Sequence, residues 1–288
     1  MKKIIERLLI FFIGIPVIVC LVLLLPYYKN LALNIAAIIM SGIGAIELSS
    51  MLEKKQIRVS KTVSFILGAL APFAMTLNIS AGFPDWTVNA IIMSGAGLAL
   101  LSGVFSRSSE IENVLNKTIG SFSLLVYPGF FMYWLIKMTM WENPAAILLF
   151  LSICFASDSF AWLFGTLLGA NNRGIIAVSP NKSIAGFAGG LIGSVIVAAC
   201  AFYIFPSIFP LNEAYTETYK IFIAMIIGFC TGIAAMLGDL AESAIKRSCD
   251  IKDSGNLMLG RGGVLDSIDS IVVAAPVFYL MYYLLFAA

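Results

Sequence analysis

The stretch MLGDLAESAIKRSCDIKDSGNLMLGRGGVLDSIDS, residues 236–270, gathers the charge of an otherwise apolar chain. We call it the charged segment. It holds six acids and four bases, ten of the 34 charged residues (18 basic plus 16 acidic) among 288 residues. It begins at the end of one very apolar segment and finishes within the start of another. Such a concentration of polar side chains predicts a functional site.

The composition of the whole chain indicates a membrane protein. Hydrophobic residues make up 60% of the sequence and charged residues only 12%, against about 25% charged in soluble domains. The net charge of +2 is too small to suggest a nucleic-acid partner. There is no histidine, which excludes His-liganded metal sites and His-based acid–base catalysis. The five cysteines show no paired or metal-type spacing and are expected to be small buried hydrophobes.

Nine apolar ranges are long enough to cross a bilayer, which takes about 20 residues as a helix. The sequence therefore predicts an all-α polytopic protein with about nine transmembrane helices. The first range is expected to be a retained helix rather than a signal peptide, because no small-residue cleavage site follows it. The predicted helices cover 7–26, 31–52, 62–80, 87–106, 119–138, 145–168, 184–205, 218–245 and 267–287.

The distribution of basic residues predicts the orientation. With a cytoplasmic N-terminus, 15 of the 18 Lys and Arg residues fall on the inner side, and only Lys29, Lys137 and Lys220 fall outside. This split is what the positive-inside rule expects. The site is therefore expected to face the cytoplasm, at the inner membrane if the source is bacterial.

The two largest inner loops, 169–183 and 246–266, both lie in the second half of the chain. We therefore expect residues 1–143 to be a transmembrane scaffold of about five helices. Residues 144–288 are expected to form the catalytic transmembrane region.

Several acids lie at membrane depth. Glu47 is close to an inner helix end, Asp158 is near the middle of its predicted helix, and Asp239 and Glu242 are in the last turns of the eighth. A carboxylate there usually marks a water-filled cavity, an ion or a partner cation, although a polar helix-packing contact is the alternative. Asp239, Glu242, Ser243 and Lys246 share one helix face, because their spacing is i, i+3, i+4 and i+7.

Asp266 and Asp269 are one turn apart at the start of the last predicted helix. Two such acids can share a Mg²⁺ ion, which prefers oxygen ligands and usually keeps substrate phosphates as well. The alternative is that the acids interact with the dipole of their own helix.

Glycines precede these acids and predict an anion site. Gly260, Gly262 and Gly263 surround Arg261 just before the helix start, where backbone N–H groups can bind phosphate. The loop 169–183 offers a second phosphate clamp, unless it is only a positive-inside loop; it carries Arg173, Ser179, Lys182 and Ser183. Phosphoryl and nucleotidyl transfers need mainly positioning and charge neutralisation, which suits a chain without histidine.

These motifs resemble those of the phosphatidate cytidylyltransferase (CDP-diacylglycerol synthase) family. The resemblance rests on GDLAES at 238–243, on Ser243–Lys246–Arg247, on Lys252–Asp253, and on Gly260 to Asp269. ASDSFAWLFGTLLG at 156–169, SPNKS at 179–183 and AIELSSMLEKK in the first half are also similar to family motifs.

The resemblance implies a polytopic helical enzyme that converts CTP and phosphatidate to CDP-diacylglycerol and pyrophosphate with Mg²⁺. It implies Asp239, Asp266 and Asp269 as metal and polar-site acids, and Lys182 and Ser183 as part of the substrate clamp. Ser243, Lys246, Arg247 and Lys252 would then serve the nucleotide or lipid phosphate. A second cation and a homodimer stay open, and so does the acyl-chain preference.

Four positions depart from the family pattern. Arg261 stands where the family has His, Ser267 where it has Arg, Ala185 where it has Glu, and Ile184 where it has Trp. One hypothesis is that Arg261, which is always charged, replaces the cation absent at 267. The departures keep three alternatives open: a related CTP-dependent lipid enzyme (another lipid phosphate, or a polyprenol-type kinase), an inactive relative, and an ion-coupled transporter using Asp158, Asp239 and Glu242.

Overall fold

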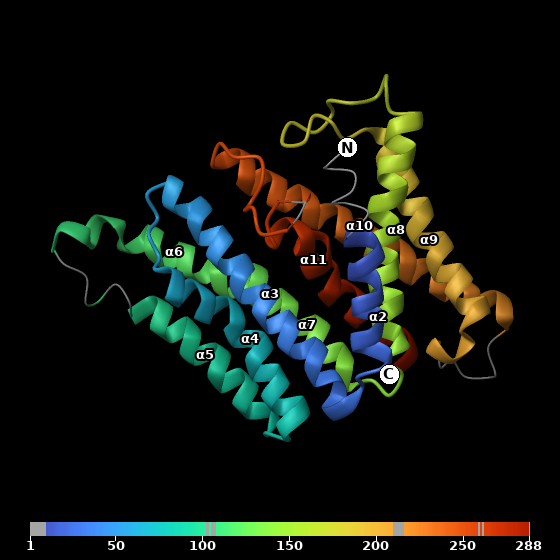
Figure 1. The fold of residues 1–288 in the computed structure, drawn as a ribbon, viewed down its shortest axis with the longest axis horizontal. Helices are drawn as coiled ribbons and strands as arrows, with labels where there is room; N and C mark the ends of the chain where they lie inside the picture. The colour runs from blue at the N-terminus through green and yellow to red at the C-terminus, as the bar shows by residue number, and fades with distance from the viewer. Residues whose placement is uncertain are drawn as a thin grey trace. The chain divides into compact units, whose positions relative to one another are not determined.

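The computed structural model describes residues 10–101, 104, 108–209, 216–258, 260 and 262–287. All regular elements in this part of the chain are helices, and two isolated bridges are its only strand-like pairings. The elements are η1 (Ile10–Gly14), α2 (Ile15–Leu23), α3 (Tyr27–Lys54), α4 (Lys61–Ala81), α5 (Asp85–Leu101), η2 (Ser108–Asn113), α6 (Val114–Leu124), η3 (Leu125–Phe130), α7 (Phe131–Lys137), η4 (Met138–Met140), α8 (Ala145–Leu167), α9 (Ile184–Ile204), η5 (Pro206–Ile208), α10 (Glu217–Ser248), α11 (Leu265–Tyr282) and η6 (Tyr283–Ala287) (Figure 1).

The prediction of an all-α polytopic membrane protein is confirmed. Each of the nine predicted ranges contains a helix. In the described residues, seven helical stretches are long and apolar enough to span a membrane: Tyr27–Lys54, Lys61–Ala81, Ile111–Met140, Ala145–Leu167, Ile184–Ile204, Glu217–Ser248 and Leu265–Phe286. The remaining two, Phe12–Leu23 and Asp85–Leu101, are shorter apolar helices.

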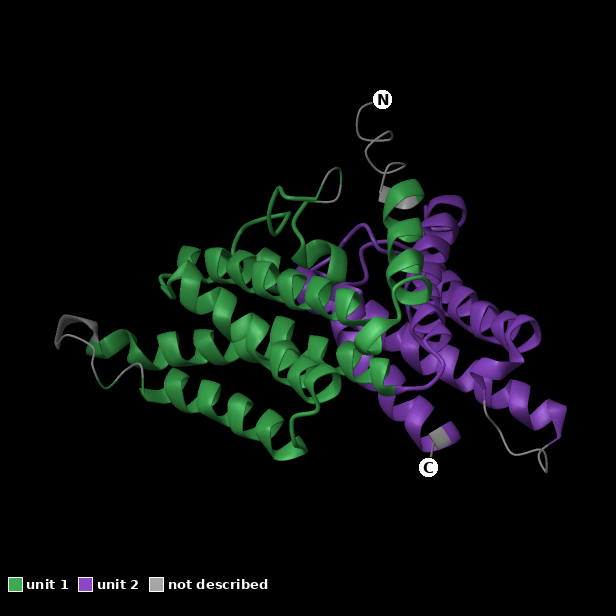
Figure 2. Cartoon of the chain, turned by 60° about the horizontal axis from the view of Figure 1, so that its bottom comes forward, with its two compact units in different colours: residues 1–140, 245–268 green, residues 141–244, 269–288 purple. Residues whose placement is uncertain are grey.

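The chain divides into two compact units, coloured separately in Figure 2. Unit 1 comprises residues 1–140 and 245–268, and unit 2 comprises residues 141–244 and 269–288. The first division lies close to the predicted boundary at 143/144. The end of α10, the loop after it and the first turn of α11 nevertheless belong with the N-terminal unit. That unit therefore includes part of the charged segment, and the division into a scaffold and a catalytic region stays a prediction.

Small residues set the helix packing in unit 1. A Cβ at Gly42 would overlap the ring of Phe65, and one at Gly68 would overlap Ala45, so α3 and α4 approach closely. Ser41 Oγ lies 2.7 Å from the carbonyl oxygens of both Gly68 and Pro128. Close approach through small residues with a polar side chain between helices is typical of membrane bundles. It gives α3 a fixed position.

Glycines also bring α8 and α9 together in unit 2, where the two helices run side by side (Figure 1). Gly189 faces Phe164, Gly193 faces Phe160, and Gly190 packs on the backbone of Ser157. The hydroxyl of Ser183 caps the start of α9 by accepting a hydrogen bond from Gly186 N at 3.0 Å. This packing fixes the start of α9 beside the last turns of α8.

Candidate active site

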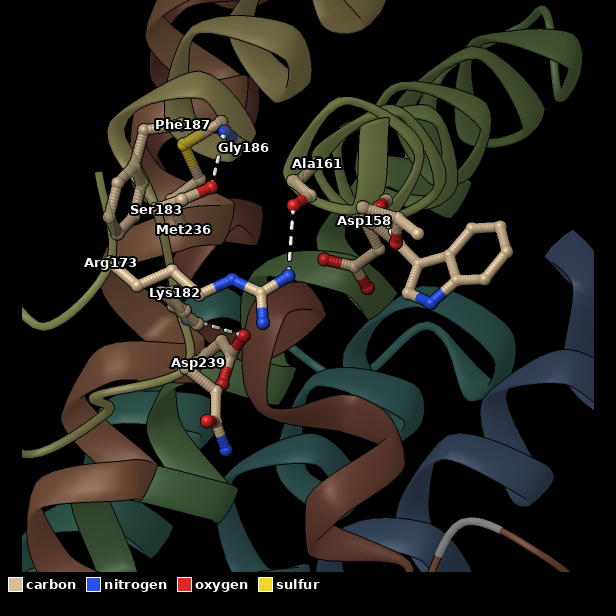
Figure 3. Close-up of a pocket in the computed structure, with 13 residues that line it drawn as sticks. Asp158, Ala161, Arg173, Lys182, Ser183, Gly186, Phe187, Met236 and Asp239 are labelled. Atoms are coloured by element: carbon tan, nitrogen blue, oxygen red, sulfur yellow. Dashed lines mark hydrogen bonds and ion pairs between the residues drawn. The ribbon is translucent and has the colours of Figure 1, made fainter. Parts of the chain in front are cut away.

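A cavity of about 400 Å³ lies in unit 2, among α8, the loop 169–183, the first turn of α9 and α10. Figure 3 shows four charged side chains around it: Asp158 from α8, Arg173 and Lys182 from the loop, and Asp239 from α10. Trp162, Phe187 and Met236 add apolar surface to the lining. The cavity thus combines two cations, two acids and an apolar wall, which suits an amphipathic anion.

Lys182 and Asp239 form the central pair of this cavity. Lys182 Nζ lies 2.6 Å from Asp239 Oδ2, and Ser243 Oγ donates to Asp239 Oδ1 at 3.4 Å. The side chains of Lys182 and Asp239 keep 25% and 34% of their exposure. Water and ligands can therefore reach the pair, and a phosphate can compete for the lysine.

Backbone hydrogen bonds stabilise the loop 169–183, which carries Arg173 and Lys182. Arg173 pairs with Ser183 as an antiparallel bridge, supported by Gly174 N donating to Pro180 O at 2.9 Å and Ile184 N donating to Asn172 O at 3.1 Å. Arg173 also donates to Gly165 O at 3.1 Å. The cations are thereby placed at the N-terminal end of α9, where the helix dipole also favours negative charge.

A second ion pair lies in unit 1. Lys246 Nζ is 2.5 Å from Asp266 Oδ1, and their side chains keep only 11% and 8% of their exposure. Asp266 Oδ2 accepts hydrogen bonds from Ser254 N and Gly263 N, each at 2.8 Å. Because the carboxylate has a cation on one oxygen and two amides on the other, its charge is well compensated in a buried position.

Glu47 of α3 reaches the same place. Its carboxylate is buried and accepts hydrogen bonds from Val264 N at 2.9 Å, Leu265 N at 2.8 Å and Ser254 Oγ at 3.0 Å. Sequence reasoning assigned this residue no role at the site. The available signal was a glutamate inside an apolar helix, which fits a packing contact equally well.

The glycine-rich turn has a different hydrogen-bond pattern from the one expected for an open anion site. Gly262 N donates to Met258 O at 3.1 Å, and Gly263 N donates to Asp266. Gly260 and Gly262 have φ angles of +71° and +105°, so the turn needs glycine at both positions. In this conformation the amides of Gly262 and Gly263 order the turn itself. Arg261 lies outside the described residues.

The other predicted residues are dispersed. Asp269 and Glu242 are buried in unit 2, and Asp269 Oδ1 accepts from Ser270 N at 2.6 Å. Arg247 is exposed and donates to Ile251 O at 3.1 Å, and Lys252 is exposed. Ser179 lies in the loop 169–183, but it is not part of the cavity lining. The predicted residues that the cavity brings together are Asp158, Arg173, Lys182, Ser183 and Asp239.

The side chains that could ligate a metal show how far the described residues fit the predicted magnesium ion. No group of three or more Cys, Asp or Glu side chains among the described residues lies close enough to hold a metal ion. Asp239 and Asp266 each contact a lysine instead. Mg²⁺ is commonly bound through one or two carboxylates plus substrate phosphates. The described residues therefore do not form an all-protein cage, and a magnesium ion shared with substrate phosphates stays a prediction.

Comparisons with known proteins agree with this chemistry. Residues 5–285 match the model of the cytidylyltransferase family. The chain is 31% identical to a phosphatidate cytidylyltransferase of Staphylococcus haemolyticus, over 82% of this chain and 85% of that protein. It is 29% identical to that of Thermotoga maritima, over 93% and 92% of the two chains. The Bacillus subtilis protein of the same name is 32% identical over 54% of this chain and 55% of its own length.

Proposed function

Because this chain belongs to the cytidylyltransferase family, we propose that it is a phosphatidate cytidylyltransferase. It transfers the cytidylyl group of CTP to phosphatidate, and the products are CDP-diacylglycerol and pyrophosphate. The observation that carries the assignment of the site is the cavity of unit 2. It places Arg173 and Lys182 at the start of α9 together with the acids Asp158 and Asp239.

The reaction needs no protein nucleophile. A phosphate oxygen of phosphatidate forms a bond to the α-phosphorus of CTP, and the bond from that phosphorus to the oxygen bridging to the β-phosphate breaks. Pyrophosphate leaves with this electron pair. A phosphomonoester has a second pKa near ~6, so it is already largely a dianion at neutral pH and needs no strong base. The protein must therefore bring two anions together and neutralise them.

The residues of the cavity suit this task. Lys182 and Arg173 bind phosphate oxygens and reduce the repulsion between the two substrates. Asp239 orients Lys182 through their 2.6 Å contact. Lys246 and Asp266 form the second pair of charges in the charged segment. Asp239, Asp266 and Asp269 are the acids proposed to ligate magnesium, which when bound neutralises the triphosphate and supports departure of pyrophosphate.

We place the site at the cytoplasmic face, where CTP is available, on the basis of the inner position of most basic residues. The lipid substrate reaches it from the surrounding bilayer. The second cation and the homodimer stay predictions.

A product assay tests this function. Purified protein is incubated in phosphatidate-containing vesicles with Mg²⁺ and CTP labelled at the α-phosphorus, and the lipids are analysed by mass spectrometry. We expect CDP-diacylglycerol and one pyrophosphate per lipid product. The Asp266→Asn and Asp269→Asn variants should each lose at least about a hundredfold in rate if these acids stabilise the transition state. Release of CDP would instead indicate a lipid kinase, and the absence of any lipid product would indicate an inactive relative.

A further inference from the structure

The start of α11 is capped by a residue of α3. The first amides of a helix have no partner inside the helix, and the preceding residue usually supplies an oxygen. Here the preceding residue is Val264, whose side chain has no acceptor. The Glu47 carboxylate accepts from Val264 N at 2.9 Å and Leu265 N at 2.8 Å instead. A negative charge at this end of the helix is also favoured by the dipole of α11.

Ser254 connects this cap to Asp266. Its Oγ lies 3.0 Å from Glu47 Oε2 and 2.8 Å from Asp266 Oδ2, and its backbone N donates to Asp266 Oδ2 at 2.8 Å. A hydroxyl carries one proton, so it donates to one of the two carboxylates at a time. Displacement of Glu47 therefore changes both the hydroxyl and the amide that face Asp266.

The loop is shaped around the glutamate. A Cβ at Gly263 would overlap both Ser254 Oγ and the Glu47 carboxylate, and a Cβ at Gly255 would also overlap this carboxylate. Glycine at both positions allows the backbone to close around a buried acid. Gly263 then donates its amide to Asp266 at 2.8 Å. Glu47 thus holds Ser254 directly, and it holds the backbone that follows Gly263 through the amides of Val264 and Leu265.

We propose that Glu47 is a positioning residue for the cytidylyl transfer: through Ser254 and the first turn of α11, it fixes the Asp266 carboxylate against Lys246. This inference rests on the proposed function, because it gives Asp266 a part in the reaction. It also gives the N-terminal half of the chain a direct part in the site, through a residue that does not touch the substrates.

The test compares Glu47→Gln and Ser254→Ala with Ser41→Ala. The glutamine keeps the length of the side chain but turns an amide group, itself a donor, toward backbone donors. Ser41 is a matched control, because it is a buried serine of α3 with two polar contacts of its own in unit 1. Ser254→Ala keeps every backbone donor and serves as the milder variant if Glu47→Gln folds poorly.

We expect kcat of Glu47→Gln to fall about tenfold to a hundredfold per folded protein, as for a misplaced catalytic group. The KM for CTP should change by less than about threefold, because Glu47 does not contact the nucleotide. The Ser254→Ala variant should show a smaller loss, and the double variant should lose less than the product of the two single losses, since both act on Asp266. The Ser41→Ala variant should keep the kcat of the wild type even if its melting temperature falls.

Hydrogen exchange supplies a readout that does not depend on activity. Amides of residues 254–258 and 262–266 should exchange faster in Glu47→Gln than in the wild type or in Ser41→Ala. Unchanged exchange there would overturn the inference, and so would faster exchange with unchanged kcat, which would reduce Glu47 to structural support. If the wild type makes no CDP-diacylglycerol, the proposed function fails, and with it the catalytic part of the inference. The exchange data would then still decide whether Glu47 orders the segment.

Discussion

The Lys246–Asp266 and Lys182–Asp239 pairs differ in how much water reaches them. Lys246 and Asp266 keep 11% and 8% of their side-chain exposure, whereas Lys182 and Asp239 keep 25% and 34%. A buried pair is costly to break, because the remaining charge has no solvent. A partly exposed pair adds little to stability, because water can replace either partner. The cavity pair is therefore free to serve ligand binding.

This difference predicts the effect of Lys182→Met. We expect kcat/KM to fall at least about tenfold, because a charge-assisted hydrogen bond to a phosphate contributes about 1.5–3 kcal/mol. The melting temperature in detergent should change little. Steady-state kinetics with CTP and phosphatidate, together with a thermal melt, measure both quantities.

Lys220→Met is the matched control for that variant. Lys220 Nζ also lies close to an acid, 2.9 Å from Glu217 Oε1, but at the other end of α10 and outside the cavity. It should keep the kinetics of the wild type. An equal loss of kcat/KM in both variants would mean that Lys182 contributes only to the overall positive charge of the protein and does not bind phosphate in the cavity.

At the scale of the elements, the cavity depends on how closely α8 and α9 approach. Gly190 of α9 packs against Ser157 O and Ala161 of α8, and against Met236 of α10. Ala161 and Met236 also line the cavity. Any side chain at position 190 must therefore push α9 away from the wall of the cavity.

The Gly190→Ala variant is expected to lower both the melting temperature and the turnover. Overpacking of a close helix contact costs about 1–3 kcal/mol, which exceeds the gain in helix propensity of alanine over glycine, about 1 kcal/mol. Gly97→Ala in α5 is the matched control, because a Cβ there meets nothing within 4 Å. It should be neutral or slightly stabilising. A neutral result at position 190 would show that α9 tolerates displacement without loss of the cavity.

The elements were predictable because their signals are local. Apolar runs of bilayer length predict helices, and Ser183 followed by glycines predicts the start of α9. Asp158 and Asp239 could be selected because charged groups are rare at membrane depth. Lys182 could be selected because it lies in a basic inner loop that precedes a helix start. The cap of α11 could not be found in this way. Glu47 lies 217 residues before Val264, and no sequence pattern relates the two.

The lack of a sequence pattern for long-range contacts also applies to residues 245–268. The two largest inner loops both lie in the second half of the chain, which is why the sequence suggests a scaffold in residues 1–143. The structure assigns residues 245–268 to the N-terminal unit, through contacts such as those of Glu47 with Ser254 and Leu265. Contacts of this kind join residues that are far apart in the sequence, and a hydropathy pattern does not predict them.

At the scale of the whole molecule, orientation in the membrane can be tested with single cysteines. The five native cysteines are replaced by alanine, and then Asn171→Cys or Ser207→Cys is introduced. Both positions are exposed, Asn171 in the loop 169–183 and Ser207 in η5 between α9 and α10. A membrane-impermeant maleimide should label Ser207→Cys in intact spheroplasts, and Asn171→Cys only after permeabilisation. The reverse pattern would place the cavity on the outer side and contradict the cytoplasmic assignment.

The capping of α11 by Glu47 also affects how the protein is made. Ser254 is synthesised 207 residues after Glu47, which corresponds to roughly 10–40 s at about 5–20 residues per second. For that interval the nascent chain carries an acid near the inner end of α3 without its final hydrogen-bond donors. An uncompensated carboxylate at membrane depth costs a few kcal/mol, so this end of α3 stays near interfacial water until the loop arrives. The segment that contains Glu47 is therefore inserted early, and its folding is completed only after residues 254–265 have been synthesised.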